Sequence, residues 1–219
     1  MVEVYDAHEQ GEIVKKWLSE NGSAIVMGLV IAFGGLFGFK QWQSWQVNNR
    51  QQASAEFEVL GELLSVGQLD AAMANFQNLQ DEYPKSPYTS MAALQFARAR
   101  IEVNQPDLAV GLYEYVMEKG YPKAMTVVAR VRLARVLLDQ GEAGLALTVL
   151  DDVEDITGFE ARFAEVRGDI HYDQGRMDEA AAAYLDALDL LEAGAGDRSK
   201  LVMKLESMGA EIPEDGSES

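Results

Sequence analysis

Cysteine is absent from the 219-residue sequence, and histidine occurs only twice. Without thiols the chain forms no disulfide bond, uses no thiolate nucleophile and binds no zinc through cysteine. Proline is also scarce, with five residues, and aromatic residues make up 9% of the chain. Alanine, leucine, glutamate and glutamine, which favour helices, are abundant instead. The composition therefore favours an all-α protein, and it leaves the cellular compartment open.

No residue pattern typical of catalysis or metal binding is present. His8 lies in a short N-terminal segment, and His171 occupies a position that predicts a packed, hydrogen-bonded side chain. The acidic stretch DDVEDITGFE (151–160) lacks the order of a calcium loop, and FGGLFGFK (33–40) lacks the Gly-Lys-Ser/Thr of a phosphate-binding loop. We therefore expect a protein that is not an enzyme and that has no metal and no cofactor.

Positive charge is also in short supply. The net charge is −18, and residues 1–40 contribute only −2 of it, because three lysines face five acidic residues there. The remainder of the chain is therefore strongly acidic, and it would repel nucleic acid and anionic lipid headgroups. Two interpretations stay open: the charge keeps the domain soluble, or it attracts a basic partner.

One long apolar segment stands out against this background. Residues 21–39 (NGSAIVMGLVIAFGGLFGF) carry no charge, and at about 1.5 Å per residue they span roughly 28 Å, close to the hydrocarbon thickness of a bilayer. Trp17 precedes the segment and Trp42 and Trp45 follow it, as interfacial anchors do. A cleaved signal peptide and a buried core helix are the alternatives. The exit FKQWQSWQ offers no small-x-small cleavage site, which favours a retained transmembrane helix over residues 21–41 after a short head, 1–20.

Glycine is frequent within the predicted span. Gly34 and Gly38 form a GxxxG spacing, and Gly28 continues a row of small residues. Such rows let a second helix approach closely, so Gly28, Gly34 and Gly38 are predicted to pack against another membrane helix, either a partner's or a second copy's. The flanking lysines are balanced, and charge alone does not decide the topology.

The rest of the chain repeats itself. The clearest unit is FAEVRGDIHYDQGRMDEAAAAYLDALDLL (163–191), whose small residue, turn glycine, alanine and aromatic residue match the tetratricopeptide pattern. Equivalent alanines at positions 72, 109, 146 and 180 are 37, 37 and 34 residues apart. Asn104 replaces one turn glycine. We therefore predict a helical repeat solenoid over residues 42–209, ending in a capping helix at 198–208, and a disordered acidic tail over 210–219.

Repeat solenoids bind partners mainly through the first helix of each pair. The repeat frame places a largely apolar row with two arginines on these helices, which suits extended, unfolded or helical peptides. Burial of some of these side chains in the core is the alternative. The predicted protein-binding groove consists of Phe57, Leu64, Leu94, Arg98, Ile101, Val131, Arg135, Leu138 and Tyr172.

Nearly the whole chain resembles a known family. The start, YDAHEQGEIVKKWLSENG (5–22), is followed by a Gly-rich span, a Trp-bearing exit and a repeat domain, and this ordered set resembles the ancillary Sec translocon subunits. The resemblance implies an inner-membrane protein with a cytoplasmic N-terminus and a periplasmic repeat domain. It also implies association with the Sec translocon and with a membrane-anchored periplasmic prolyl isomerase.

The implied function is that of an adaptor, which binds unfolded or newly translocated proteins and passes them to periplasmic chaperones. A scaffold or regulator that binds one dedicated signalling or envelope-assembly partner is the alternative. Many different client chains at the groove would favour the adaptor, and a single stoichiometric partner would favour the scaffold.

Overall fold

The computed structural model describes residues 7–153, 155–191 and 198–212, and all regular elements within these ranges are α-helices. They are α1 (Ala7–Ser65), α2 (Leu69–Glu82), α3 (Pro87–Glu102), α4 (Pro106–Lys119), α5 (Lys123–Asp139), α6 (Ala143–Asp151), α7 (Glu160–Asp173), α8 (Met177–Asp189) and α9 (Arg198–Ser207). The prediction of an all-α protein is confirmed. The chain divides into two compact units, Met1–Gln52 and Ala53–Ser219, and α1 contributes to both.

The first unit is built from the α1 residues up to Gln52. An 18-residue window of this helix has a mean hydropathy of 2.0, and none of that window is buried within the chain. Large apolar side chains such as Phe33 and Phe37 are 68% and 74% exposed. Water solvates such a surface poorly, whereas lipid tails do not penalise it. Length and composition therefore fit a membrane span.

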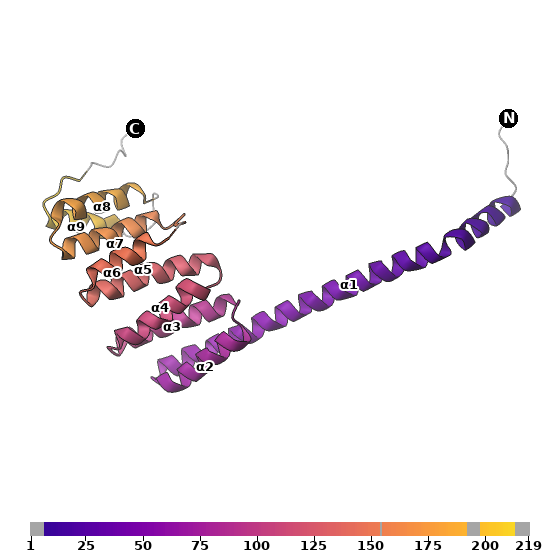
Figure 1. Ribbon diagram of the computed structural model, residues 1–219, viewed down its shortest axis with the longest axis horizontal. Helices are drawn as coiled ribbons and strands as arrows, with labels where there is room; N and C mark the ends of the chain where they lie inside the picture. The colour runs from indigo at the N-terminus through magenta and orange to yellow at the C-terminus, as the bar shows by residue number, and fades with distance from the viewer. Residues whose placement is uncertain (1–6, 154, 192–197, 213–219) are drawn as a thin grey trace, which may run out of the picture. The chain divides into compact units, whose positions relative to one another are not determined.

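The second unit is a stack of helix pairs. The pairs α3–α4, α5–α6 and α7–α8 follow one another, preceded by the end of α1 with α2 and followed by α9 (Figure 1). The first helices of the pairs (the end of α1, then α3, α5 and α7) are called the A helices below, and α2, α4, α6 and α8 the B helices. The predicted repeat solenoid with its single capping helix is thus confirmed in outline.

The turn between the two helices of each pair has the same geometry in all four repeats. Gly67 donates its N–H to the Leu64 carbonyl (3.1 Å) and Gln68 donates to the Leu63 carbonyl (2.9 Å), which is the Schellman pattern. This motif needs a residue with positive φ just after the helix. The structure has φ values of 72°, 58°, 80° and 72° at the four equivalent positions Gly67, Asn104, Gly141 and Gly175. Asn104 therefore adopts the left-handed conformation of the glycine it replaces.

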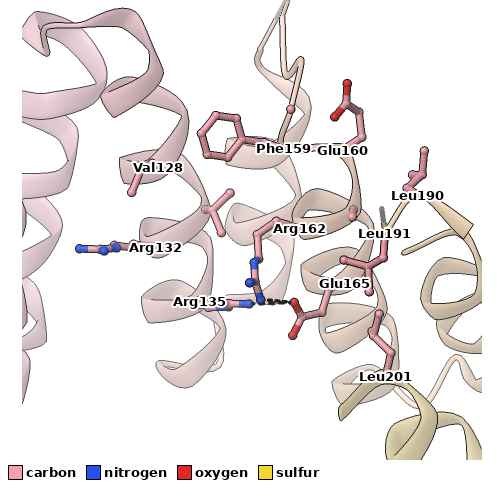
Figure 2. A pocket seen from close by; sticks show the side chains of 13 residues that line it. Val128, Arg132, Arg135, Phe159, Glu160, Arg162, Glu165, Leu190, Leu191 and Leu201 are labelled. Atoms are coloured by element: carbon pink, nitrogen blue, oxygen red, sulfur yellow. Dashed lines mark hydrogen bonds and ion pairs between the residues drawn. The ribbon is translucent and has the colours of Figure 1, made fainter. Parts of the chain in front are cut away.

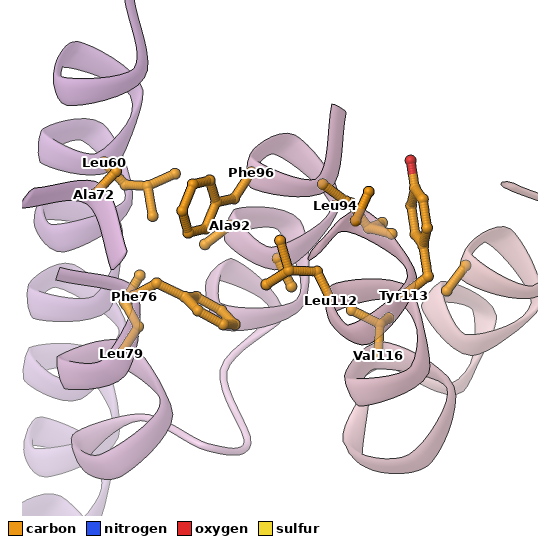
Figure 3. Close-up of a cluster of buried hydrophobic side chains, with 14 of the residues drawn as sticks. Leu60, Ala72, Phe76, Leu79, Ala92, Leu94, Phe96, Leu112, Tyr113 and Val116 are labelled. Atoms are coloured by element: carbon orange, nitrogen blue, oxygen red, sulfur yellow. The ribbon is translucent and has the colours of Figure 1, made fainter. Parts of the chain in front are cut away.

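Three hydrophobic clusters form the core of the stack. The first joins the end of α1 to α2, α3, α4 and α5, and Phe76 lies at its centre, 2% exposed. The Phe76 ring meets Phe96 and Tyr115 edge-on, with centroids 6.3 and 5.6 Å away, and Figure 3 shows how side chains from successive helices interleave. The second cluster joins α5, α6 and α7, and the third joins α7, α8 and α9. Each cluster spans a repeat boundary, so stacking supplies the core that no single pair has.

The capping helix lies where the sequence predicts it, whereas no break in α1 marks the predicted limits of the first segments. α9 covers most of the predicted capping helix 198–208, and Leu201 and Leu205 bury it against the third cluster. Residues 213–219 of the predicted tail lie outside the described residues, whereas Ala210 and Ile212 pack against the third cluster. α1 continues through residues 20, 41 and 52 without a break. The limits of head, span and repeat domain therefore stay predictions from composition.

Candidate protein-binding groove

Two hollows lie side by side along α5, α7 and α9, with volumes of about 720 and 680 Å³. Successive turns of the same helices line them. On α5, Arg135 lines the first hollow and Leu138 lines the second. On α7, Glu165 lines the first hollow and Asp169 lines the second. The two hollows together are called the groove below. It is formed by the A helices of the last two repeats and by the capping helix.

The first hollow has apolar walls and basic side chains. Its lining consists of Val128, Val131, Arg132, Arg135, Gly158, Phe159, Glu160, Ala161, Arg162, Glu165, Leu190, Leu191 and Leu201. In Figure 2, Arg135 from α5 and Arg162 from α7 both reach Glu165, while Arg132 points away from them. Leu190, 50% exposed, lies on the far side of the hollow from α5. Three arginines against two glutamates make this hollow locally positive in an otherwise acidic protein.

Glu165 is the centre of a charge network at the junction of the hollows. Its carboxylate lies 2.5 Å from Arg162, 3.3 Å from Lys204 and 3.5 Å from Arg135. Burial by itself would raise the pKa of Glu165, but Lys204, Arg162 and Arg135 outweigh burial and hold this pKa below its usual value. The carboxylate is therefore ionised at neutral pH and holds three cations from α5, α7 and α9 together.

A second carboxylate extends the network. Asp169 Oδ1 accepts hydrogen bonds from Lys204 Nζ (2.5 Å) and from the Tyr184 hydroxyl (2.7 Å), and Lys204 also lies 5.0 Å from the centroid of the Tyr184 ring. Burial and the bond to Asp169 raise the pKa of Tyr184, so its hydroxyl stays protonated and continues to donate. Lys204 thereby connects the capping helix to α7 and α8.

The second hollow has the opposite charge. It is lined by Leu138, Asp139, Asp169, Tyr172, Asp173, Tyr184, Lys204 and Ser207. Asp169 is neutralised by Lys204, whereas Asp139 and Asp173 are exposed and form no ion pair within the described part of the chain. Tyr172, 48% exposed, presents its ring beside them. This end of the groove is acidic with an aromatic surface.

The structure brings four of the nine predicted groove residues together. Val131 and Arg135 line the first hollow, and Leu138 and Tyr172 line the second. Val131 is only 4% exposed, so it forms the floor rather than the rim.

The other five predicted residues lie on the end of α1 and on α3. Leu94 is 6% exposed in the first core cluster, and Phe57 and Leu64 pack against that cluster half-buried. Arg98 and Ile101 are exposed on α3, and Arg98 pairs with Glu102 at 2.9 Å. The sequence left open whether these residues line a groove or lie in the core, and Leu94 lies in the core.

Several groove residues were not predicted: Asp139, Phe159, Arg162, Asp173, Tyr184 and Lys204. Asp139 and Asp173 occupy equivalent positions, one residue after Leu138 and Tyr172, so the repeat frame contained a signal for them. Lys204 lies outside the repeats, on the capping helix, and is separated from its partner Glu165 by 39 positions. No repeat pattern could connect those two.

His171 occupies the position of Leu63 and Leu137 in the earlier repeats. Its side chain is half-buried, as predicted, but its Nδ1 has no hydrogen-bond partner among the described residues. Burial and the neighbouring Arg176 lower the pKa of His171. It is a packing residue in an apolar position, and the described residues contain no group of three potential metal ligands that could include it.

Comparison with known proteins assigns the chain to a family. A family model described as a tetratricopeptide repeat-like domain matches residues 15–210. The "Ancillary SecYEG translocon subunit" of Haemophilus influenzae is 30% identical over 181 residues, which cover 81% of this chain and 86% of the relative. The chain belongs to the family of ancillary SecYEG translocon subunits. The resemblance seen in the sequence is therefore confirmed.

Other members of this family match as much of the chain. The relatives of the same name from Escherichia coli and Neisseria gonorrhoeae are 27% and 29% identical, and the matches cover 84% and 91% of this chain and 88% and 97% of the relatives. The family match starts at residue 15 and therefore includes the apolar segment of α1. The apolar helix and these relatives fit a single-pass protein of the inner membrane.

The glycine row of the apolar helix has no neighbour within the described chain. A Cβ atom added at Gly28, Gly34 or Gly38 would meet no atom of the chain within 4 Å. The described chain therefore leaves this row of small residues uncovered. Packing of the row against a helix of another membrane protein stays a prediction.

Proposed function

We propose that this protein is a non-enzymatic adaptor of the inner membrane, which associates with the SecYEG translocon and binds newly translocated segments in the groove. Its N-terminus lies in the cytoplasm and its repeat domain in the periplasm. The groove holds an unfolded segment briefly and releases it to periplasmic chaperones. A membrane-anchored periplasmic prolyl isomerase works beside it on the same chains.

The groove is the observation that carries this proposal. It combines open apolar surface with charges of both signs, contributed by α5, α7 and α9. Apolar side chains bind unfolded segments through surface that a folded protein would bury. The wide mouth and mixed lining suit many sequences rather than one tightly fitted ligand.

The family supports the proposed location. Relatives that match most of this chain carry the name "Ancillary SecYEG translocon subunit", and the exposed apolar helix would hold the repeat domain at the membrane. A groove tethered close to the translocon exit meets each emerging segment at high effective concentration. Weak, quickly reversible binding is then sufficient for capture and for release.

Site-specific photocrosslinking tests the proposal. A photoreactive phenylalanine analogue replaces Tyr172, which is 48% exposed in the groove, and in a second variant it replaces Leu138. Translocation intermediates of several secretory proteins, stalled at different lengths, are then illuminated. We expect adducts with several different clients, and only at lengths at which the segment has passed the translocon.

A matched position provides the control. Leu145 is 54% exposed on the B helix α6 and lines neither hollow, so a probe there should give few adducts. Equal labelling from Leu145 and Tyr172, or no client adduct at any groove position, would refute the proposal. A single recurrent protein in the adducts would identify a dedicated scaffold instead.

A further inference from the structure

We infer that the groove selects extended segments that carry an acidic residue and a basic residue two to five positions apart, with apolar residues between them. This inference rests on the proposed function and specifies its ligand. It follows from three features of the groove: a positive end, a negative end, and the distance that separates them.

The positive end of the groove has more basic groups than its one shared carboxylate neutralises. Arg135 and Arg162 are 39% and 46% exposed, and both reach the single carboxylate of Glu165, which Lys204 also contacts. Arg135 lies farthest from it, at 3.5 Å. Two half-exposed guanidinium groups beside one shared carboxylate can accept a second carboxylate with little rearrangement, because each has further N–H donors. An acidic side chain of a bound segment supplies it.

The negative end of the groove has two carboxylates that no basic side chain of the described chain neutralises. Lys204 neutralises Asp169, but Asp139 and Asp173 project at the end of α5 and α7 without an ion pair in the described chain. They are the last residues of these helices, where the helix dipole is also negative. A lysine or arginine of a bound segment is therefore attracted by these carboxylates and by the helix dipoles.

Helix geometry sets the spacing. Arg135 and Asp139 are four residues apart on α5, and Arg162 and Asp173 are 11 residues apart on α7. At a rise of about 1.5 Å per residue, the charges of each pair are separated by roughly 6 to 16 Å along the helix axis. An extended chain advances about 3.3 Å per residue. The two charges of the ligand are thus two to five residues apart. Between the two charges of the ligand, apolar residues contact the groove surface formed by Phe159, Leu190 and Tyr172.

Synthetic peptides test this inference on the full-length protein in detergent micelles. The probe is a labelled Glu-Leu-Ala-Leu-Lys peptide with glycine-serine flanks and blocked ends, measured by fluorescence anisotropy at low salt. Peptides with two glutamates, two lysines or two glutamines at the charged positions are compared with it. We expect the mixed-charge peptide to bind about fivefold more tightly than each of the others, and added salt to remove this advantage. The reversed peptide should bind equally, because a segment can lie in either direction.

Charge reversal distinguishes an electrostatic effect from a folding defect. Arg135→Glu should reverse the preference, so that the two-lysine peptide binds more tightly than the mixed one, which a misfolded protein could not do. Asp173→Lys should correspondingly favour the two-glutamate peptide. Arg98→Glu is the matched control, because Arg98 is the repeat equivalent of Arg135 and lines neither hollow. It should leave the order of affinities unchanged.

The outcomes separate this inference from the proposed function. Equal binding of all four peptides, or loss of binding without reversal in both charge variants, would overturn the charge selection. If client adducts at Tyr172 persist in that case, the groove still binds segments and only the selectivity is wrong. If the peptides fail to bind and the adducts are also absent, both conclusions fail.

Discussion

Gly168 shows how a single missing methyl group permits close helix packing. A Cβ atom at this position would lie 2.5 Å from two atoms of the Tyr184 ring, far inside contact distance. Tyr184 is 2% exposed and is held by its bond to Asp169, so it has little room to move. Alanines at the equivalent positions 97 and 134 are tolerated as buried residues. At Gly168 the ring of Tyr184 occupies the space that an added methyl group would need.

Gly168→Ala should therefore destabilise the repeat domain by about 1–3 kcal/mol, as overpacking of a filled core does. Chemical denaturation followed by circular dichroism measures the change. Gly111→Ala is the control, because Gly111 is an exposed residue of α4 with no atom near its added Cβ. That change should stabilise the helix by roughly 0.5–1 kcal/mol. Equal effects of the two substitutions would refute the packing argument.

His171 makes the stability of the last repeat depend on pH. Its pKa is lowered in the folded state, chiefly by burial, so the unfolded chain takes up a proton more readily. Stability is unaffected by this residue well above the unfolded pKa of about 6.5, and it falls as the pH drops below that value. His171→Leu restores the residue found at the equivalent positions 63 and 137 and should remove this part of the loss. Thermal melts of both proteins between pH 7.5 and 5 test this, and parallel curves would contradict it.

At the scale of the helices, aspartates at helix C-termini lower the stability of the repeat domain. α7 ends at Asp173 and α8 ends at Asp189, where the helix dipole is also negative. Asp173→Lys and Asp189→Lys should each stabilise the fold by about 0.5–1 kcal/mol, measured as a shift of the unfolding midpoint. Only Asp173 lines the groove, so only the first substitution should weaken binding of the mixed-charge peptide. A loss of stability in either variant would contradict the dipole argument.

The helices themselves could be predicted because their signals are local. Asn104 could be placed in a turn from the repeat frame, and its φ of 58° shows that it adopts the conformation of the turn glycine it replaces. The division of buried and exposed positions on α3 could not be predicted, because Leu94 and Arg98 have the same spacing on the helix whether or not a neighbouring helix covers them. Leu94 is 6% exposed in the first core cluster, whereas Arg98 is exposed and pairs with Glu102.

At the scale of the molecule, the order of head, span, repeats and capping helix follows from composition and periodicity. The charge network does not, because it joins Arg135, Glu165 and Lys204 from three separate helices. Such contacts join residues that are far apart in the sequence, and no local or repeat pattern connects them. The sequence therefore predicted a groove but not its two charged ends.

The proposed function requires the groove to face the compartment into which the translocon delivers its clients. Topology is the most direct test, and the absence of cysteine makes it simple. Ala74→Cys places a thiol at an exposed position of α2, and Ser19→Cys places one before the apolar segment. In cells with a permeabilised outer membrane, a membrane-impermeant maleimide should label Ala74→Cys, and it should label Ser19→Cys only after the inner membrane is lysed. The reverse pattern would place the groove in the cytoplasm, away from every translocated segment, and would contradict the proposed function.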